Sequence, residues 1–483
     1  MSTASSSLRG IPPLTPLEQV GPRGYLRYNF LIALPADYDP DDVLRVLRAG
    51  WKAIANRIPE LACELVPDTT PATTPTQQQQ QAGLMKLQKI TGDYEPLTAR
   101  DLRSPELFPD SYEELRARHF PLSAFRDALF ARRDTWPAAG DRLPVAAMQA
   151  NFLRGGLALQ CCFVHVVGDW NSFCTWLEAW AEECRRVQGE AISHPVDVSD
   201  AIFADREKIM RASGNNPGRP EDHPELTVLP FTPTGAPPKM LSKAHRGQVF
   251  YLSPEASVAL KEDASPRNAT SANTTITQAQ AYISTNDAVV ALIWRAVMGA
   301  QHPLETLEGD PVSVCNVAID GRLRTDPAVH PRTLGNFLTW TAATLPIRSM
   351  LDGSTNIADV ALAIRRALGP VGPQWVDDVT TLVENLEDVS RLVATAFLDA
   401  PGKNCAQTSW IQYSPYEFSW GEKVFGGNKI EAVRTLDVGV INGGQAVLPR
   451  LPDGGIEFIV GVEESCLPRL LEDPLLARYV QAR

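Results

Sequence analysis

The sequence predicts an α/β protein with two domains. Its 483 residues are too many for one simple hydrophobic core. A stretch rich in Pro, Gly and Asn at residues 212–238 is typical of a long linker. Both flanking halves alternate strand-like apolar runs with amphipathic helices. We therefore expect an N-terminal domain at residues 1–211, a crossover linker at 212–240 and a C-terminal domain at 241–483.

The first half contains two strand-helix pairs. The run YNFLIAL at 28–34 predicts a strand, and LALQCCFVHVV at 157–167 predicts another. The helix after each strand is indicated by apolar residues at intervals of three and four: Val43, Leu47, Trp51, Ile54 and Ile58, then Phe173, Trp176, Leu177, Trp180 and Cys184. His165 and Asp169 therefore lie at a junction between a strand and a helix, where α/β proteins commonly present reactive groups.

The second half repeats this alternation. Residues 285–297, TNDAVVALIWRAV, predict a helix with Thr285 as its N-cap. The β-branched apolar runs at 312–319 and 455–463 predict buried strands. Two loops are expected besides the linker. The Pro/Thr/Gln tract at 67–82 should be disordered because it has no hydrophobic face to bury, and residues 263–276 form a shorter loop.

Composition excludes several classes of function. The chain has 45 Lys and Arg against 57 Asp and Glu, a net charge of −12, and no dense basic cluster that would neutralise nucleic acid. It has neither a signal-like N-terminus nor a run of roughly 20 apolar residues that would span a membrane, which predicts a cytoplasmic protein. The eight cysteines form no CxxC pair and the seven histidines are far apart, so we expect neither a disulfide framework nor a metal site.

His165 is the candidate on which the functional interpretation depends. A histidine at the end of an apolar run is more often a hydrogen-bonded core residue than a metal ligand or a general base. The aspartate four residues later is compatible with each of these roles. The spacing alone does not decide between them.

Several motifs together resemble the BAHD acyltransferases. HVVGD at His165–Asp169 matches that family's HxxxD motif, and EFSWG at Glu417–Gly421 is similar to its DFGWG motif. Other matching segments occur in the order that the family shows: LTPLEQ at 14–19, NRIPELACELV at 56–66, STNDAVVALIW at 284–294, IDGRLR at 319–324, LGN at 334–336 and TSW at 408–410. The resemblance covers nearly the whole chain.

The resemblance implies two similar domains of the chloramphenicol-acetyltransferase type, with an active-site channel at their interface. It implies an acyl-CoA, with acetyl-CoA favoured, as co-substrate, and no permanently bound cofactor. The acceptor is expected to be a hydroxyl group, in preference to an amine, on a small specialised metabolite. We also expect a monomer.

The resemblance assigns roles to individual residues. His165 becomes the general base, because neutral imidazole suits proton abstraction at cytosolic pH. The Thr408 hydroxyl and the Trp410 indole N–H become donors to the oxyanion, with interface packing as the alternative role of Trp410. The LGN match assigns Asn336 to substrate binding.

Other matched residues are expected to be structural. The family's aspartate turns away from the channel and pairs with an arginine, so Asp169 should pair with Arg322 or Arg324. The counterparts of Glu417, Trp420 and Gly421 lie away from the chemistry.

This chain departs from the family pattern at two places. Trp170 follows Asp169 where the family has glycine, and Ser419 replaces a glycine of DFGWG. These changes are typical of a divergent, fungal-type branch of the family.

Two alternatives to a CoA-dependent enzyme stay open. One is a condensation-domain-like enzyme with a carrier-bound donor, although Val164 replaces the first histidine of its HHxxxDG motif. The other is a catalytically silent binding or scaffold relative, for which Trp170 is the main support.

Overall fold

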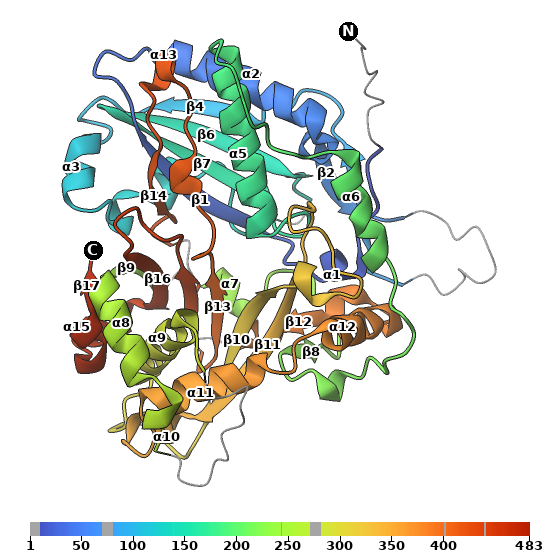
Figure 1. The fold of residues 1–483 in the computed structure, drawn as a ribbon, viewed down its shortest axis with the longest axis vertical. Helices are drawn as coiled ribbons and strands as arrows, with labels where there is room; N and C mark the ends of the chain where they lie inside the picture. The colour runs from blue at the N-terminus through green and yellow to red at the C-terminus, as the bar shows by residue number, and fades with distance from the viewer. Residues whose placement is uncertain are drawn as a thin grey trace.

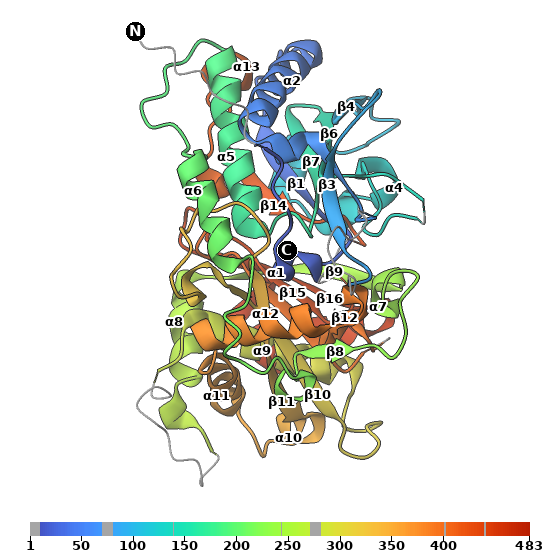
Figure 2. The same cartoon turned by 90° about the vertical axis from the view of Figure 1, so that its right-hand side faces the viewer.

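The computed structural model describes residues 10–69, 81–138, 140–242, 244–270, 282–399, 402–438 and 441–483. Most of the predicted tract at 67–82 and part of the predicted loop at 263–276 lie outside these residues. The chain forms two α/β layers, one above the other in Figure 1, each built on its own sheet. Figure 2 shows the same two layers from the side.

The upper layer is a five-stranded sheet. Its strand order is β14 (Ile430–Arg434), β1 (Tyr25–Ala33), β7 (Gly156–Val164), β6 (Ala146–Leu153) and β4 (Leu97–Asp101). A small sheet beside it consists of β3 (Met85–Lys89), β2 (Cys63–Pro67) and β5 (Leu143–Pro144). The helices of this layer are α2 (Pro40–Arg57), α3 (Tyr112–Ala117), α4 (Asp127–Phe130), α5 (Trp170–Val187), α6 (Asp200–Ala204) and, from the second half of the sequence, α13 (Glu422–Phe425), which contacts α2.

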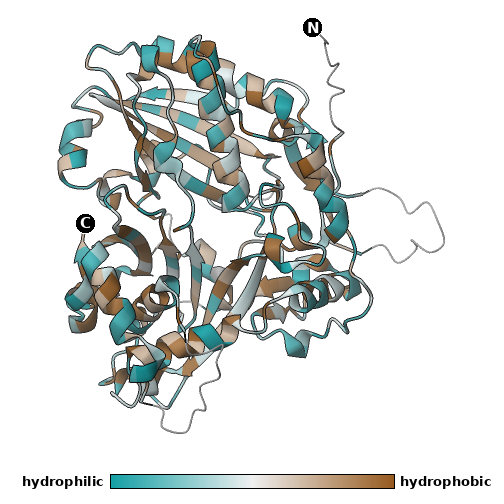
Figure 3. Cartoon of the chain, in the orientation of Figure 1, coloured by the Kyte–Doolittle hydropathy of each residue, from teal (hydrophilic) through white to brown (hydrophobic). Residues whose placement is uncertain are grey.

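Helices α2 and α5 cover one face of the upper sheet (Figure 1). Both helices are amphipathic, as the alternating brown and teal segments in Figure 3 show. Their apolar faces bury Trp51, Trp176 and Trp180 against the sheet, and the Trp180 indole donates to the Leu47 carbonyl at 2.9 Å. This packing fixes the strand-helix junction between β7 and α5.

The lower layer is a seven-stranded sheet. Its order is β11 (Leu338–Pro346), β10 (Val312–Asp320), β13 (Cys405–Ser409), β15 (Gly444–Val447), β16 (Ile456–Glu463), β9 (His245–Leu252) and β17 (Val480–Ala482). The helices of this layer are α7 (Pro238–Leu241), α8 (Pro254–Asp263), α9 (Thr285–Gln301), α10 (Ile347–Leu351), α11 (Ile357–Leu368), α12 (Pro373–Asn385), α14 (Leu467–Leu471) and α15 (Pro474–Tyr479). The short N-terminal helix α1 (Pro16–Gln19) packs against α12 and β11. The apolar helix α9 packs on one face of this sheet.

The predicted elements occur close to their expected positions, with one correction. The N-cap of α9 is Ser284 and not Thr285, because the Ser284 side chain accepts from the Asp287 N–H while the Asp287 side chain accepts from the Ser284 N–H. A reciprocal pair of this kind satisfies two backbone donors at the helix start. Thr285 is therefore the first helical residue.

One strand from the second half of the sequence belongs to the sheet of the first half. β14 lies near the C-terminus in sequence but pairs antiparallel with β1 in the upper sheet, where Asn29 opposes Arg434. Arg434 also forms a buried ion pair with Glu457 of β16 in the lower sheet, at 2.8 Å. The proposed C-terminal domain at 241–483 is therefore not a single spatial unit, because part of it completes the N-terminal sheet.

The predicted linker at 212–240 packs against the second half. Its strand β8 (Leu226–Val228) pairs with β12 (Leu392–Ala394), and the Ser213 N–H donates to Asp377 of α12 at 2.7 Å. His223 lies buried between Glu225 and Asp378, at 2.9 and 3.0 Å. These contacts hold the crossover segment along the lower layer.

None of the helices in the described residues is long and apolar enough to cross a bilayer.

Candidate active site

His165 lies in the turn between β7 and α5. The flanking strands β1 and β6 hold β7, and Asp169 caps α5 by accepting from the Ser172 N–H at 3.0 Å. The His165 N–H donates to the Gly24 carbonyl at 2.9 Å. The strand, the helix cap and this backbone bond together fix the position of the imidazole.

The hydrogen bonds of His165 indicate which ring nitrogen is basic. Nδ1 lies 3.2 Å from the Gly168 carbonyl oxygen, which only accepts, so Nδ1 carries the proton. Nε2 then has the free lone pair, as a general base requires. Burial lowers the pKa of His165 below its ordinary value of 6.5, although Asp169 and the Gly168 carbonyl oppose this effect. The ring is therefore neutral at neutral pH.

A cavity of about 620 Å³ lies between the two layers, and His165 is in its wall. The first half contributes Tyr28 and Trp170, and the second half contributes Thr408 of β13 and Trp410, the residue that follows this strand. A volume of this size suits a small-molecule ligand. The predicted base and the predicted oxyanion donors therefore line the same cavity.

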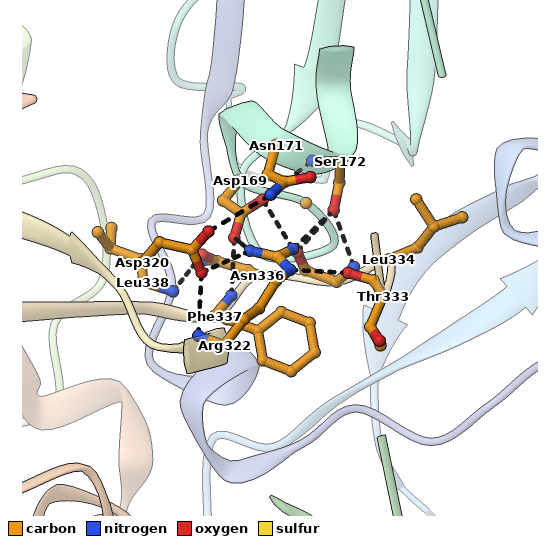
Figure 4. A network of polar contacts seen from close by, with 12 residues as sticks. Asp169, Asn171, Ser172, Asp320, Arg322, Thr333, Leu334, Asn336, Phe337 and Leu338 are labelled. Carbon is orange, nitrogen blue, oxygen red and sulfur yellow. Dashed lines mark hydrogen bonds and ion pairs between the residues drawn. The ribbon is translucent and has the colours of Figure 1, made fainter. Parts of the chain in front are cut away.

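Asp169 is held in a network of polar contacts at the wall of the cavity (Figure 4). Arg322 donates two bonds to its carboxylate, at 2.6 and 3.0 Å, and the Phe337 N–H donates a third at 3.0 Å. Arg322 also donates to Asp320, to the Ser172 hydroxyl and to the carbonyls of Thr333 and Gly335. Its guanidinium lies 4.3 Å from the centre of the Phe337 ring. The network joins the turn after β7 to the segments that flank β10 and β11.

The Asp169 carboxylate is ionised in this network. Burial opposes ionisation, but the charge and hydrogen bonds of Arg322 outweigh it, so the pKa of Asp169 is lowered below its ordinary value. The structure selects Arg322, and not Arg324, as the predicted arginine partner. Arg324 instead lines the cavity and donates to the Val371 carbonyl.

Asn336 lies behind His165 and is almost fully buried. Its side-chain amide donates to the His165 carbonyl at 2.7 Å, and its side-chain oxygen accepts from the Leu338 N–H at 3.1 Å. Asn336 is not among the residues that line the cavity. This placement differs from the predicted contact with substrate, because both ends of the side chain are used to hold the histidine turn.

Thr408 and Trp410 lie at the end of β13, on the wall of the cavity. Trp410 is 3% exposed and packs into the core of the first half. Its ring stacks on Trp170 with the centroids 3.7 Å apart and the planes at 7°, and the edge of Tyr28 completes the cluster. A stacked indole presents only its edge, where the N–H lies, to a ligand. Packing and hydrogen-bond donation are therefore compatible in Trp410.

Trp170 explains how the turn tolerates the absence of the family's glycine. It is the first residue of α5 and has ordinary helical backbone geometry. Its side chain fills the space beside Trp410 instead of blocking the histidine. The departure in sequence thus changes the wall of the cavity and leaves the backbone of the turn unstrained.

Glu417, Trp420 and Gly421 do not line the cavity. Glu417 is exposed and pairs with Lys429 at 2.6 Å, while Trp420 is buried against Trp180. Gly421 has φ of 110°, and a Cβ there would lie 2.0 Å from the Gln188 amide. Only glycine fits this position. The motif supports the start of α13, as expected for residues away from the chemistry.

The sequence interpretation did not include two cavity residues, Gln407 and Gln445. Both are buried and line the cavity from the neighbouring strands β13 and β15. Gln407 directly precedes the TSW motif, but no pattern marks Gln445, because its position opposite Gln407 depends on strand pairing. In the described part of the chain, no group of His, Cys, Asp and Glu has the arrangement of a metal site.

Comparison with known proteins decides the family. Residues 128–449 match the Transferase family, and residues 25–184 match the Trichothecene 3-O-acetyltransferase-like N-terminal domain. The chain belongs to the Transferase family. The predicted BAHD-type acyltransferase family, the two-layer α/β fold and the acyltransferase class of enzyme are thereby confirmed.

The chain is also similar to individual proteins over most of its length. The chain is 26% identical to an enoyl-CoA isomerase/hydratase of Penicillium crustosum. The match covers 96% of this chain but only 50% of the relative. It is 25% identical to an acyltransferase of Botryotinia fuckeliana, with 99% of each chain covered. The fold superposes on F. graminearum TRI101, solved with coenzyme A and deoxynivalenol, with a TM-score of 0.79, 20% identity and coverage of 98% and 100%.

Proposed function

We propose that this transferase moves an acetyl group from acetyl-CoA to a hydroxyl of a small specialised metabolite, with His165 as general base. The observation that carries the proposal is the cavity, whose lining includes a neutral imidazole and the side chains of Thr408 and Trp410. The O-acetyltransferase likeness of residues 25–184 supports a hydroxyl acceptor, and the coenzyme A bound to the similar TRI101 fold supports the donor.

The proposed reaction gives each of these side chains one role. His165 Nε2 takes the acceptor's proton while the acceptor oxygen forms a bond to the thioester carbon. The negative charge that develops on the thioester oxygen is stabilised by the Thr408 hydroxyl and the Trp410 indole N–H. The carbon–sulfur bond then breaks, and the protonated imidazole returns its proton to the coenzyme A thiolate. Both substrates are bound together, and no covalent enzyme intermediate forms.

Asp169 and Arg322 position the base in this mechanism. The Asp169 carboxylate accepts hydrogen bonds from Arg322 and from backbone N–H groups. The His165 ring donates to a backbone carbonyl and not to this carboxylate. Asp169 therefore holds the turn that carries the histidine and does not accept its proton. Asn336 has the same positioning role through the His165 carbonyl.

We further propose that the protein is a cytoplasmic monomer. All eight cysteines lie in the described residues as free thiols, which fits a reducing compartment. The cavity is formed within one chain, so catalysis requires no second copy.

Removal of the base tests the proposal. His165→Ala should remain folded but lose about 10²- to 10⁴-fold in turnover, because that is the usual contribution of a general base. The measurement is release of free thiol from acetyl-CoA with a panel of hydroxylated specialised metabolites. His330→Ala is the matched control, since His330 is exposed and lies outside the cavity. Near-normal turnover by His165→Ala, or transfer from a carrier-bound donor only, would contradict the proposal.

A further inference from the structure

Trp410 bridges the two layers of the molecule. Its backbone N–H donates to the Val447 carbonyl of β15 at 2.8 Å, and its carbonyl accepts from the Tyr413 N–H at 3.0 Å. The main chain of Trp410 is therefore held by the lower sheet. Its indole ring, in contrast, packs with the core of the first half. The direction of the ring, and with it that of the indole N–H, thus depends on side chains of the other layer.

Trp170 covers one face of this ring. The two indoles are parallel within 7° and their centroids are 3.7 Å apart, whereas Tyr28 meets the Trp410 ring edge-on, at 4.8 Å and 83°. A face-to-face contact at van der Waals distance prevents the ring from tilting or turning over on that side, because either movement would drive one ring into the other. Trp170 therefore restricts the movements that would turn the Trp410 N–H away.

Trp170 is itself firmly held. It is the first residue of α5 and is 5% exposed, and its ring centre lies 5.1 Å from that of Phe173 and 6.4 Å from that of Phe30. Its own indole N–H is buried and has no hydrogen-bond partner among the described residues. The Trp170 ring therefore acts through its flat surface and not as a donor.

The same turn carries the base and this ring. Trp170 directly follows Asp169, whose bonds to Arg322 and to the Ser172 N–H fix the backbone between His165 and α5. The segment that holds the base thus also holds the ring stacked on the predicted oxyanion donor. We propose that Trp170 is a positioning residue that orients the Trp410 indole for stabilisation of the oxyanion, an inference that rests on the proposed function.

A steric role of Trp170 gives a different kinetic result. Trp170 lines the cavity, so its bulk could instead decide which acceptors fit. A residue that orients a transition-state donor affects turnover, whereas a residue that only shapes the acceptor pocket affects the KM of the acceptor. A glycine at this position, as in the family motif, has no side chain that could perform either role.

The test compares two substitutions of Trp170 by thiol release from acetyl-CoA, using the best acceptor of the metabolite panel. Trp170→Leu keeps an apolar side chain but removes the flat ring, and it should lower kcat about 10- to 100-fold with little change in either KM, since a small misplacement of a reacting group has this effect. Trp170→Phe keeps an aromatic ring and loses only an unpaired N–H. It should retain most of the wild-type kcat.

Trp51→Leu is the matched control for loss of a buried indole. Trp51 is 4% exposed, lies outside the cavity and packs edge-on against Trp180 at 5.1 Å. The substitution should lower the melting temperature because it leaves a void in the core, but kcat of the folded protein should be unchanged. General destabilisation, in contrast, would reduce turnover in both leucine variants.

A double variant tests whether Trp170 acts through Trp410. Trp410→Phe has already lost the N–H that Trp170 would orient. Adding Trp170→Leu to this background should therefore lower kcat by no more than about 2-fold further, although the same change is costly in the wild-type background.

Fluorine NMR reports on the ring without requiring activity. In protein labelled with 5-fluorotryptophan, the resonance that is missing from Trp410→Phe belongs to Trp410. Its frequency depends on the stacked ring beside it, so it should move in Trp170→Leu and stay in place in Trp51→Leu.

Four outcomes would overturn the inference. These are wild-type kcat of Trp170→Leu with a raised KM for the acceptor, an equal loss of kcat in the two backgrounds, an unmoved Trp410 resonance, and normal kcat of Trp410→Phe. The first would assign Trp170 to acceptor selection alone. Absence of thiol release by the wild-type protein would instead refute the proposed function, and the fluorine spectrum would still show whether Trp170 holds the ring.

Discussion

Two buried polar regions border the cavity, and they differ in how far their hydrogen bonds are satisfied. Around Asp169 and Arg322 every side-chain oxygen and nitrogen has a partner inside the protein. Around Gln407 and Gln445 the described residues offer the amide atoms only the Cys405 thiol beside Gln445, which is a weak hydrogen-bonding group. Asp169 is 8% exposed and Arg322 fully buried, while Gln407 and Gln445 are 1% and 2% exposed. The first region is fully hydrogen-bonded within the chain, and the second is not.

This difference separates buried polar residues that hold the site together from buried polar residues that do not. A buried network whose members are all paired is rigid and fixes the chain segments that it joins. A buried group without a partner lowers stability unless a ligand supplies one. The comparison therefore predicts large stability defects from changes in the Asp169 network, and little or no loss of stability from apolar replacements of Gln407 and Gln445.

The largest stability effect is expected from Asp169→Asn. The substitution preserves size but leaves the buried charge of Arg322 without its main partner, which should cost about 3 to 5 kcal/mol of unfolding free energy. Activity should fall together with stability, because the histidine turn loses its anchor. Urea denaturation monitored by tryptophan fluorescence measures the change.

Asp320→Asn provides the matched control for this prediction. Asp320 also accepts from Arg322, at 2.9 Å, but its side chain is 30% exposed. Its loss should cost about 1 kcal/mol, the usual worth of one accessible hydrogen bond. If Asp169→Asn instead retained full stability and lost activity, Asp169 would act directly in catalysis and the comparison would fail.

Thr408→Val should affect turnover without affecting stability. The change preserves shape but removes the hydroxyl proposed for the oxyanion, so turnover should fall about 10- to 10³-fold with little change in coenzyme A affinity. Trp410→Phe should have a similar effect, with some loss of stability because the indole stacks on Trp170. The double variant should lose less than the product of the two defects if both donors serve one oxyanion.

Steady-state kinetics with saturating acetyl-CoA distinguishes the alternatives for these two residues. Unchanged turnover at saturation with a raised KM for the acceptor would show that Thr408 and Trp410 only shape the acceptor pocket. The oxyanion donors would then lie elsewhere in the cavity.

The pH profile should show the lowered pKa of His165. A general base works when neutral, and burial lowers the pKa of His165 in the folded protein. Activity should therefore be constant near neutral pH and fall as the pH drops through a midpoint below 6.5. The dependence of kcat/KM on pH gives this midpoint, and residual activity of His165→Ala should lack the acidic limb. A midpoint above the ordinary value would contradict the assigned burial effect.

The smallest effect is expected from shortening the Pro/Thr/Gln tract. Its composition provides no apolar face, and closing a shorter loop changes the free energy by well under about 1 kcal/mol. Deletion of residues 72–80 should leave the melting temperature and acyl transfer almost unchanged. Deletion of 72–81 should lower the melting temperature, because the Gln81 side-chain amide donates hydrogen bonds to three backbone carbonyls. Equal effects of the two deletions would contradict this distinction.

The sequence determined much of the fold and the position of the base. Apolar periodicity identified β7 and α5, and the residues between these elements placed His165 and Asp169 at a junction. Local patterns suffice there because the strand and the helix are each defined by neighbouring residues. The resemblance of the motifs then indicated the family, and it limited the arginine partner of Asp169 to Arg322 or Arg324.

Only the tertiary structure decided the choices that depend on distant segments. Arg322 and Arg324 are two residues apart, and the turn after β10 directs one into the Asp169 network and the other to the cavity. β14 completes the sheet of the first half, which no boundary drawn along the sequence anticipates. Gln407 and Gln445 become a pair only through the register of β13 and β15, because hydrogen bonding between strands, and not proximity in sequence, brings their amides together.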